Sequence, residues 1–290
     1  MENRRTTFER DLQARLGRRA IDDKIVLDLH EHSDDGELPW LRATDGVFWI
    51  DEFASLKPQR GYGRQALAEL CMLADEANVT LAANPWASVG EGMLRQDLLE
   101  RFYQSMGFGW RRDHVMVRDA FAPTAVAIAR DIGYQPLPNR SEYILDTCEP
   151  RNDLTSTAFV FPVMADGTII MANNRQRKIE VPGGHIEKGE TQWQAAVREA
   201  FEEVGAVVDG LVPIGHQRML SQGLPPQNWR YPLPLAYQSF FAARVVSTTE
   251  YVENDECLAP AFVNDLETLL PHVRMFAARA RWVMNNGKVG

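Results

Sequence analysis

The C-terminal half of the chain has short apolar runs on either side of one amphipathic helix. Runs of β-branched and aromatic residues predict strands at 158–164, 168–172, 178–181, 212–219 and 235–246. Asp166 and Gly167 separate the first two runs and predict a hairpin turn. The periodicity over 269–286 predicts a closing amphipathic helix, with Pro271 in its first turn. This order of elements predicts an α/β domain.

The helix inside this half has clear start and stop signals. Thr191 is suited to be the N-cap, and Gln194 three residues later completes a capping box. Gly205 supplies a left-handed C-terminal stop. Four apolar residues fall at helical spacing and predict the buried stripe: Trp193, Val197, Ala200 and Val204.

In the N-terminal half a strand, a glycine turn and a helix follow one another. The strand run 47–56 leads through the turn 57–64 into a helix pattern at 65–78. One face of that helix collects Leu67, Leu70 and Ala74. Backbone N–H groups and the helix dipole favour phosphate at such a helix N-terminus. The order therefore indicates an anion-binding turn, although a short glycine turn alone is not specific.

The other elements of this half are less distinct. They are a helix at 6–18, strands near 25–31, 38–42 and 79–83, and helical runs that end at 99–108 and begin at 125–133. The proline-rich stretch 135–140 predicts a connector. A length of 290 residues favours two domains, which we expect at 1–140 and 141–290, both α/β.

Composition narrows the class of protein. The chain is 45% hydrophobic and 24% charged, which is ordinary for a globular protein, and it has no apolar run of membrane length. The first residues lack the core of a signal peptide, and three well-separated cysteines indicate a reducing compartment, so we expect a cytoplasmic protein. A net charge of −9 argues against a nucleic-acid binder but not against a nucleotide substrate.

Three carboxylates lie on one face of the central helix. Glu199, Glu202 and Glu203 are related as i, i+3 and i+4, so their like charges repel one another. A divalent cation would reverse the sign of that interaction, and carboxylate oxygens suit Mg²⁺ or Mn²⁺. The alternative is an acidic face exposed to solvent.

The stretch GGHIEKGETQWQAAVREAFEEVGA, at 183–206, resembles the Nudix box, the signature of hydrolases that cleave nucleoside diphosphates linked to another moiety. Every charged and glycine position of that pattern is present. Ala200 and Ala206 depart from it, because the family usually has larger aliphatic residues there. The resemblance implies a Nudix α/β/α sandwich for 141–290, a nucleotide substrate, and bound Mg²⁺ or Mn²⁺.

The resemblance also implies roles for single residues. The implied metal ligands are the Gly183 carbonyl and the side chains of Glu199, Glu202 and Glu203. Arg198 would orient the box glutamates through an ion pair, and Glu190 would tie the loop to the helix. A general base is also needed, either a box glutamate or a downstream loop acid. Among the loop acids we choose Glu256, because the CLAPAFV segment after it resembles the one that follows such acids; a solvated loop is the alternative.

Loops outside the box set the substrate in this family. Here they are 173–177 and 221–231. Trp229 and Tyr231 are candidates to stack on a base, with Arg175, Arg177 and Arg230 as candidates to pair with phosphates. Ordinary surface structure explains these residues equally well. Nucleoside triphosphates, ADP-ribose, dinucleotides and capped RNA all remain open as substrates.

The N-terminal turn resembles the acetyl-CoA pyrophosphate loop of GNAT N-acetyltransferases, in which Arg-Gly-x-Gly follows a central strand. The later Tyr-x-x-x-Gly-Phe ending, at 103–108, is also typical of that family. The resemblance implies that the pyrophosphate is held by Arg60, Gly61, Gly63 and Arg64. Tyr103 would protonate the departing thiolate, and Glu52 is a candidate base. Gln65 departs from the pattern, which has Gly or Ala at that position.

Three functions follow from these resemblances. The preferred one is a metal-dependent Nudix pyrophosphohydrolase that carries a GNAT-like domain. The second is a bifunctional protein that also transfers an acetyl group from acetyl-CoA to an amine. The third is a nucleotide sensor or scaffold without turnover, against which the complete glutamate set argues. Both families commonly form homodimers, and the oligomeric state is open.

Overall fold

A computed structural model of the chain describes residues 25–31, 47–55, 62–85, 95–111, 114–229, 231–251 and 257–286, with the single positions 8, 10, 11 and 253. The chain divides into the compact units Met1–Val126 and Ala127–Gly290. The division falls inside strand β6 (Thr124–Arg130), whereas the sequence predicts the boundary near residue 140. No helix of the described residues is long and apolar enough to cross a membrane.

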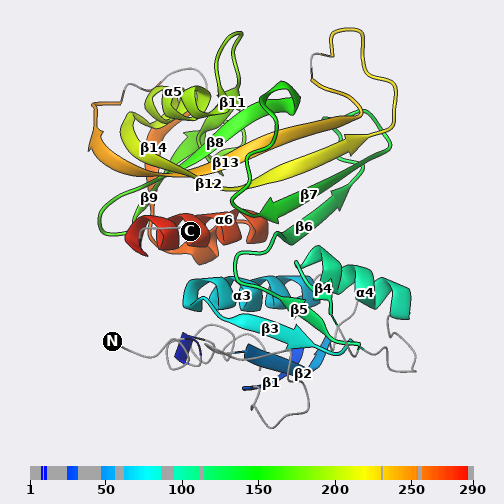
Figure 1. The fold of residues 1–290 in the computed structure, drawn as a ribbon. Helices are drawn as coiled ribbons and strands as arrows, with labels where there is room; N and C mark the ends of the chain where they lie inside the picture. Colours follow the sequence, from blue (N-terminus) through cyan, green and yellow to red (C-terminus); the bar gives the residue numbers. More distant parts are fainter. Residues whose placement is uncertain are drawn as a thin grey trace. The chain divides into compact units, whose positions relative to one another are not determined.

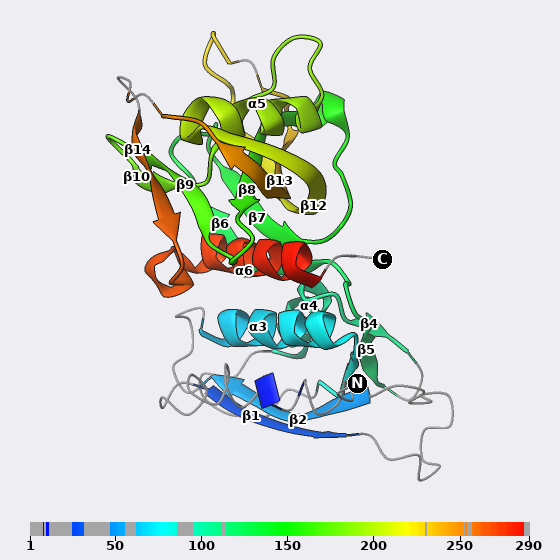
Figure 2. The same cartoon turned by 90° about the vertical axis from the view of Figure 1, so that its left-hand side faces the viewer.

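In the first unit, the described residues form a five-stranded sheet with two helices. The sheet runs in the order β1-β2-β3-β5-β4, and only the β2–β3 pair is parallel. The strands are β1 (Ile25–Glu31), β2 (Val47–Ser55), β3 (Thr80–Ala83), β4 (Gly109–Trp110) and β5 (Met116–Arg118). Helix α3 (Tyr62–Ala77) connects the parallel pair and lies along one side of the sheet (Figure 2). Helix α4 (Gln96–Ser105) follows β3.

The core of this unit forms where the periodicity predicts it. Leu67, Leu70 and Ala74 of α3 are fully buried. Beside them Arg118 is buried too, and its guanidinium makes two hydrogen bonds to the Asp75 carboxylate, of 2.8 and 3.1 Å. After α4 the chain turns at Gly107, where φ is +85° and a Cβ would lie 2.8 Å from the Pro123 carbonyl oxygen. This position therefore requires glycine.

In the second unit, the described strands form a nine-stranded sheet. Its path is β10-β9-β8-β13-β12-β7-β6, with β11 added to β8 and β14 added to β9. Besides β6, the strands are β7 (Asn139–Leu145), β8 (Thr155–Val163), β9 (Ile169–Asn174), β10 (Lys178–Glu180), β11 (Gly183–His185), β12 (Ala206–Ser221), β13 (Leu235–Thr248) and β14 (Cys257–Val263). The central β8–β13 pair is parallel.

The sheet of the second unit lies between two helices, as Figure 1 shows. Helix α5 (Gln192–Val204) packs on one face, where Ala195, Ala196 and Ala200 contact a core that includes Phe241. Helix α6 (Pro271–Asn286) covers the other face, where Phe276 packs on Phe240 with ring centroids 4.4 Å apart. The small alanines let α5 approach the sheet closely. Glu199 and Glu203 of this helix therefore lie beside β11.

Several local predictions are wrong. The alanine-rich run at 125–133, predicted to be helical, is largely strand β6, and the predicted connector at 135–140 leads directly into strand β7. Pairing of these strands within the sheet overrides the helix propensity of alanine. Strand β14, in CLAPAFV, is not predicted at all. Val197, predicted to be buried, is 42% exposed, because α5 turns its alanines toward the sheet instead.

His272 in the first turn of α6 makes the stability of the second unit depend on pH. Its ring packs on Tyr143 with centroids 4.5 Å apart, and burial lowers the pKa of the imidazole below its usual range. The unfolded chain therefore binds this proton at higher pH than the folded one. Stability is then fully present above the ordinary histidine pKa and is lost as pH falls toward the lowered one.

We expect His272→Gln to flatten this acid-side loss of stability. Urea unfolding between pH 7.5 and pH 5, followed by circular dichroism, measures the slope. His114→Gln, which replaces an exposed histidine of the first unit, is the control. An unchanged slope in His272→Gln would show that this histidine contributes nothing to the pH dependence.

Candidate active site

The caps of α5 fix where its glutamates lie. The Thr191 side chain accepts from the Gln194 backbone N–H at 3.2 Å, and the Gln194 side chain accepts from the Thr191 N–H at 2.8 Å. Gly205 ends the helix in the left-handed conformation, with φ at +63°. The predicted capping box and glycine stop are both confirmed. The helix therefore has a fixed start, and Glu190 lies directly before its N-cap.

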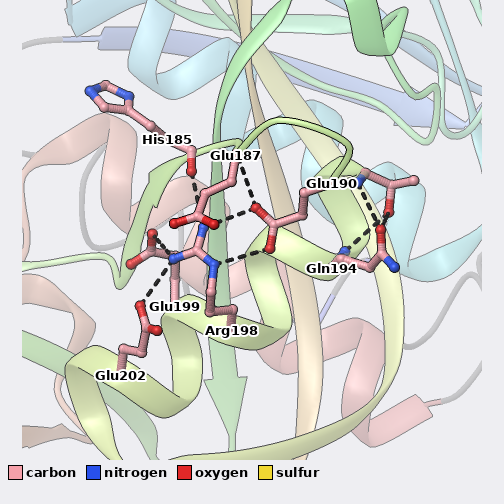
Figure 3. A network of polar contacts seen from close by, with 8 residues as sticks. His185, Glu187, Glu190, Gln194, Arg198, Glu199 and Glu202 are labelled. Carbon is pink, nitrogen blue, oxygen red and sulfur yellow. Dashed lines mark hydrogen bonds and ion pairs between the residues drawn. The ribbon is translucent and has the colours of Figure 1, made fainter.

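Arg198 is the centre of the polar network drawn in Figure 3. Its guanidinium makes two parallel hydrogen bonds to Glu190, from Nε and Nη2, each of 3.0 Å. Nη1 donates to Glu199 at 2.7 Å and to Glu202 at 3.0 Å, and Nη2 also donates to the His185 carbonyl oxygen at 3.0 Å. One planar cation thus joins the loop, strand β11 and two helical carboxylates.

The carboxylates of this network differ in their environments. The hydrogen bonds from Arg198 hold the pKa of Glu190 below its usual range. Glu199 is only 9% exposed, and burial raises the pKa of its carboxyl, although Arg198 acts in the opposite direction. Glu202 has a side chain that is 55% exposed. The site therefore contains one carboxylate whose charge is poorly solvated beside another that is open to solvent.

Two glycines bring strand β11 against this helix. Gly184 leaves the space that Glu199 occupies, because a Cβ there would lie 2.1 Å from Glu199 Oε1. Gly183 donates its N–H to Glu203 Oε2 at 2.8 Å, and a Cβ there would lie 2.6 Å from the Ala158 carbonyl oxygen. The glycine pair is therefore required by close packing on both sides, against α5 and against β8.

The carboxylates of α5 are the candidate ligands for a divalent cation. In the part of the chain that the structure describes, no three His, Cys, Asp or Glu side chains converge into a metal-binding cluster. The reason is that Glu199 and Glu202 point to Arg198 while Glu203 accepts from Gly183. The donor set still fits Mg²⁺ or Mn²⁺, because it consists of oxygens only and includes the buried Glu199, whose charge a cation would stabilise.

A polar cleft of about 480 Å³ opens beside the N-terminal end of α5. Its walls include Asp153, His185, Glu187, Glu190 and Tyr231. The Tyr231 hydroxyl lies 2.9 Å from Nε2 of His185, and Thr157 Oγ1 lies 3.4 Å from Nδ1 of the same ring. The cleft thus extends from Glu190 to Tyr231, in the loop between β12 and β13. Because its wall is acidic, an anionic substrate would be repelled unless cations were bound as well.

Sequence reasoning missed His185 and Thr157. His185 occupies a variable position of the box, and Thr157 is 28 residues away in the chain. The antiparallel pairing of β11 with β8 sets these two residues opposite each other. Only the register of the β11–β8 pair could have indicated this contact. A strand as short as β11 leaves no clear sign of its register in the sequence.

The remaining predicted site residues lie partly outside the described residues and partly in the first unit. Arg60, Gly61 and Glu256 lie outside the described residues, as does Arg230. Arg64 donates to Ser105 at 3.0 Å and to the Ala125 carbonyl at 2.8 Å. Tyr103 is 5% exposed and packs edge-on against Phe108, and burial raises the pKa of its hydroxyl well above the usual range. Gly63 lies in the first turn of α3.

The two candidate phosphate-binding arginines of the 173–177 loop have carboxylate partners in their own unit. Arg175 pairs with Glu253 at 3.2 Å, and Arg177 pairs with Glu180 at 2.7 Å. Both pairs are largely exposed, so each contributes little to stability.

Arg198→Lys is expected to lower activity at this site by about tenfold or more, because an ammonium cannot make the two parallel bonds to Glu190 while also holding Glu199 and Glu202. Steady-state turnover measures the effect. Arg274→Lys is the matched control, because Arg274 of α6 pairs with the exposed Glu267 at 2.8 Å. Equal turnover of wild type and Arg198→Lys would contradict the orienting role.

Comparison with known proteins identifies the class of this unit. Residues 153–277 match the model of the NUDIX domain, so the C-terminal part of the chain is a Nudix domain with the Nudix fold. Nudix hydrolases generally use divalent metal ions such as Mg²⁺ or Mn²⁺. The matched range does not reach the first unit.

Solved structures similar to the chain include three described as hydrolases or pyrophosphohydrolases. The pyrophosphohydrolase BsRppH of Bacillus subtilis is 18% identical, with a TM-score of 0.41, and the match covers 57% of this chain and 99% of that one. A NUDIX hydrolase of Listeria monocytogenes is 14% identical, with a TM-score of 0.36 and coverages of 45% and 94%. A MutT NUDIX hydrolase of Burkholderia pseudomallei is 16% identical, with a TM-score of 0.32 and coverages of 42% and 95%. Comparison with curated proteins gave no match.

Proposed function

We propose that the second unit is a metal-dependent hydrolase that cleaves the pyrophosphate bond of a nucleoside diphosphate derivative. The observation that carries this proposal is the Arg198 network, in which one cation holds Glu190, Glu199 and Glu202 together, and of these Glu190 also lines a cleft of about 480 Å³. The NUDIX match over 153–277 supports the same reaction class.

The proposed metal ligands are the Gly183 carbonyl and the carboxylates of Glu199, Glu202 and Glu203. When bound, Mg²⁺ or Mn²⁺ supplies charge neutralisation of the pyrophosphate and a lowered pKa of the attacking water. Nη1 of Arg198 holds the carboxylates of Glu199 and Glu202 close to each other. Glu203 ties that side to β11 through the Gly183 N–H.

Proton removal from the attacking water needs a carboxylate near the cleft. Glu190 is held ionised by Arg198, so it is better suited to positioning than to accepting a proton. We therefore keep two candidates for the base, a box glutamate and Glu256. Glu256→Gln separates them, because a loop base predicts a large loss of turnover with little change in metal affinity.

The substrate class is tested by product analysis. The full chain with Mg²⁺ or Mn²⁺ is offered nucleoside triphosphates, ADP-ribose, dinucleotides and capped RNA in ¹⁸O-labelled water. Cleavage of any of these, with the label in one of the two phosphate products, supports the proposal and locates the attacked phosphorus. Absence of cleavage over the whole panel, with or without metal, would count against hydrolysis and would favour a nucleotide sensor.

A second candidate function concerns the first unit. The parallel strands β2 and β3 are joined by α3, which begins at Tyr62 and Gly63, and a helix N-terminus after a parallel strand favours a pyrophosphate group. We infer from this arrangement, together with the GNAT resemblance, that acetyl transfer from acetyl-CoA to an amine acceptor is worth testing. Calorimetric titration with acetyl-CoA, followed by a thiol-release screen of amines, tests it. Absence of binding would leave hydrolysis as the sole candidate activity.

A further inference from the structure

A side-chain hydrogen bond joins strand β11 to the loop between β12 and β13, residues 222–234. The Tyr231 hydroxyl of this loop lies 2.9 Å from Nε2 of His185, and the two rings pack with centroids 5.3 Å apart. Both residues line the polar cleft of about 480 Å³. His185 is exposed and Tyr231 is half-buried, so this contact belongs to the wall of the cleft and not to the core.

His185 is itself fixed from two other sides. Nδ1 of its ring lies 3.4 Å from Oγ1 of Thr157, a buried residue of β8. Its carbonyl oxygen accepts from Nη2 of Arg198 at 3.0 Å, and the ring points away from that arginine (Figure 3). Whichever ring nitrogen carries the proton, the two hydroxyl groups can supply the complementary partner, because a hydroxyl both donates and accepts. The backbone of His185 therefore belongs to the Arg198 network and its side chain to the loop.

The loop has few other attachments to the unit. Its residues 224–228 are all exposed. The Gln222 N–H donates to the Pro138 carbonyl oxygen at 2.9 Å where the loop begins, and the Trp229 N–H donates to Pro226 within the loop at 3.0 Å. Among the described residues of the loop, Tyr231 is the one whose side chain hydrogen-bonds to another element. Exposed segments with few such bonds open at little cost, so the second half of the loop depends on Tyr231.

We propose that the contact between Tyr231 and His185 is a clasp, and that both are positioning residues of the hydrolase. The clasp holds the loop in place before the substrate arrives, together with Trp229, whose ring meets that of Tyr231 with centroids 4.8 Å apart. A surface that is already ordered costs less to bind. The inference rests on the proposed function and deepens it, because it assigns substrate affinity to the loop and the chemical step to the carboxylates of α5.

The first experiment measures the loop without any substrate. Tyr231→Phe removes only the hydroxyl, and His185→Gln keeps the backbone carbonyl that accepts from Arg198. Amide hydrogen exchange of the full chain, read by mass spectrometry, should be about threefold or more faster in peptides that cover 222–234 in either variant. Tyr237→Phe and His216→Gln make the same chemical changes on β13 and β12 and should leave exchange in these peptides unchanged.

The second experiment measures kinetics on a nucleotide that the wild type cleaves. Each clasp variant should raise KM about threefold or more and change kcat by less than about twofold, because the carboxylates of α5 are untouched. The double variant should have the same KM as the single ones, because all three lack the same contact. A merely structural role would lower the fraction of active protein, and so kcat, while KM stayed the same.

The outcomes separate this inference from the proposed function. Unchanged exchange in the loop peptides, unchanged KM in both single variants, or effects on KM that multiply in the double variant would overturn the clasp while leaving hydrolysis in place. Faster exchange together with a raised KM in both variants would support it. A chain that hydrolyses no nucleotide would overturn the positioning role along with the proposed function, and the exchange rates would then still decide whether the contact holds the loop.

Discussion

Glu202→Gln is expected to lower the rate of pyrophosphate hydrolysis on the order of a thousandfold while the fold remains intact. The amide has the shape of the carboxylate but not its charge, so it binds a divalent cation poorly. The structural loss is small, because the side chain is 55% exposed and its ion pair with Arg198 is an i,i+4 pair on α5. Such exposed pairs contribute about 0.3–0.5 kcal/mol.

Steady-state kinetics with varied Mg²⁺ tests this expectation, and a urea titration verifies the stability. Glu267→Gln provides the matched control, since Glu267 is 60% exposed and also pairs with an arginine, at 2.8 Å. Turnover of Glu202→Gln equal to that of Glu267→Gln would refute the assignment of Glu202 to the metal. A large loss of stability in Glu202→Gln would show that the residue is structural.

Alanine substitutions at the two adjacent glycines of β11 are expected to have different main effects. One should lower the stability of the unit and the other its activity. At Gly183 a Cβ would lie 2.4 Å from Cδ1 and 2.8 Å from Cα of Phe159, and the backbone of β8 cannot move aside. Gly183→Ala should therefore destabilise the unit by about 1–3 kcal/mol or more. At Gly184 the obstacle is the carboxylate of Glu199, which is the end of a side chain. Gly184→Ala should displace that carboxylate and lower turnover at least about a hundredfold, with a smaller loss of stability.

Urea unfolding and steady-state kinetics of the two variants measure this difference. Gly133→Ala serves as the stability control, because a Cβ there meets nothing within 4 Å. If Gly184→Ala kept full turnover, the buried position of Glu199 would have no part in the reaction. If Gly183→Ala kept full stability, the close contact between β11 and β8 would not constrain the fold.

The central helix and its caps could be predicted because their signals are local. Thr191, Gln194 and Gly205 act within one turn of α5, and the structure places each in its predicted role. The spacing of Glu199, Glu202 and Glu203 likewise fixes their common face. The local pattern could not show which way that face turns, since Val197 has the right spacing for the core but is exposed while the alanines are buried.

Features that depend on distant pairing could not be predicted. The run at 125–133 has a composition that favours a helix, and its place in the sheet makes most of it strand β6. Gln135 and Ser221 lie side by side in the wall of an apolar pocket of about 120 Å³, although 86 residues of sequence separate them. Tyr231 contacts His185 although 46 residues separate them. The sequence therefore indicates Tyr231 as an aromatic candidate but does not indicate that His185 lies beside it.

The central claim is that the carboxylates of α5 make hydrolysis depend on a divalent cation. The most direct measurement is nucleotide product release by wild type and Glu203→Gln, first in EDTA and then with added Mg²⁺, on a substrate that wild type cleaves. The account predicts no release in EDTA, recovery with Mg²⁺ in wild type, and no recovery in Glu203→Gln. Release in EDTA at the full rate, or full recovery in the variant, would contradict it.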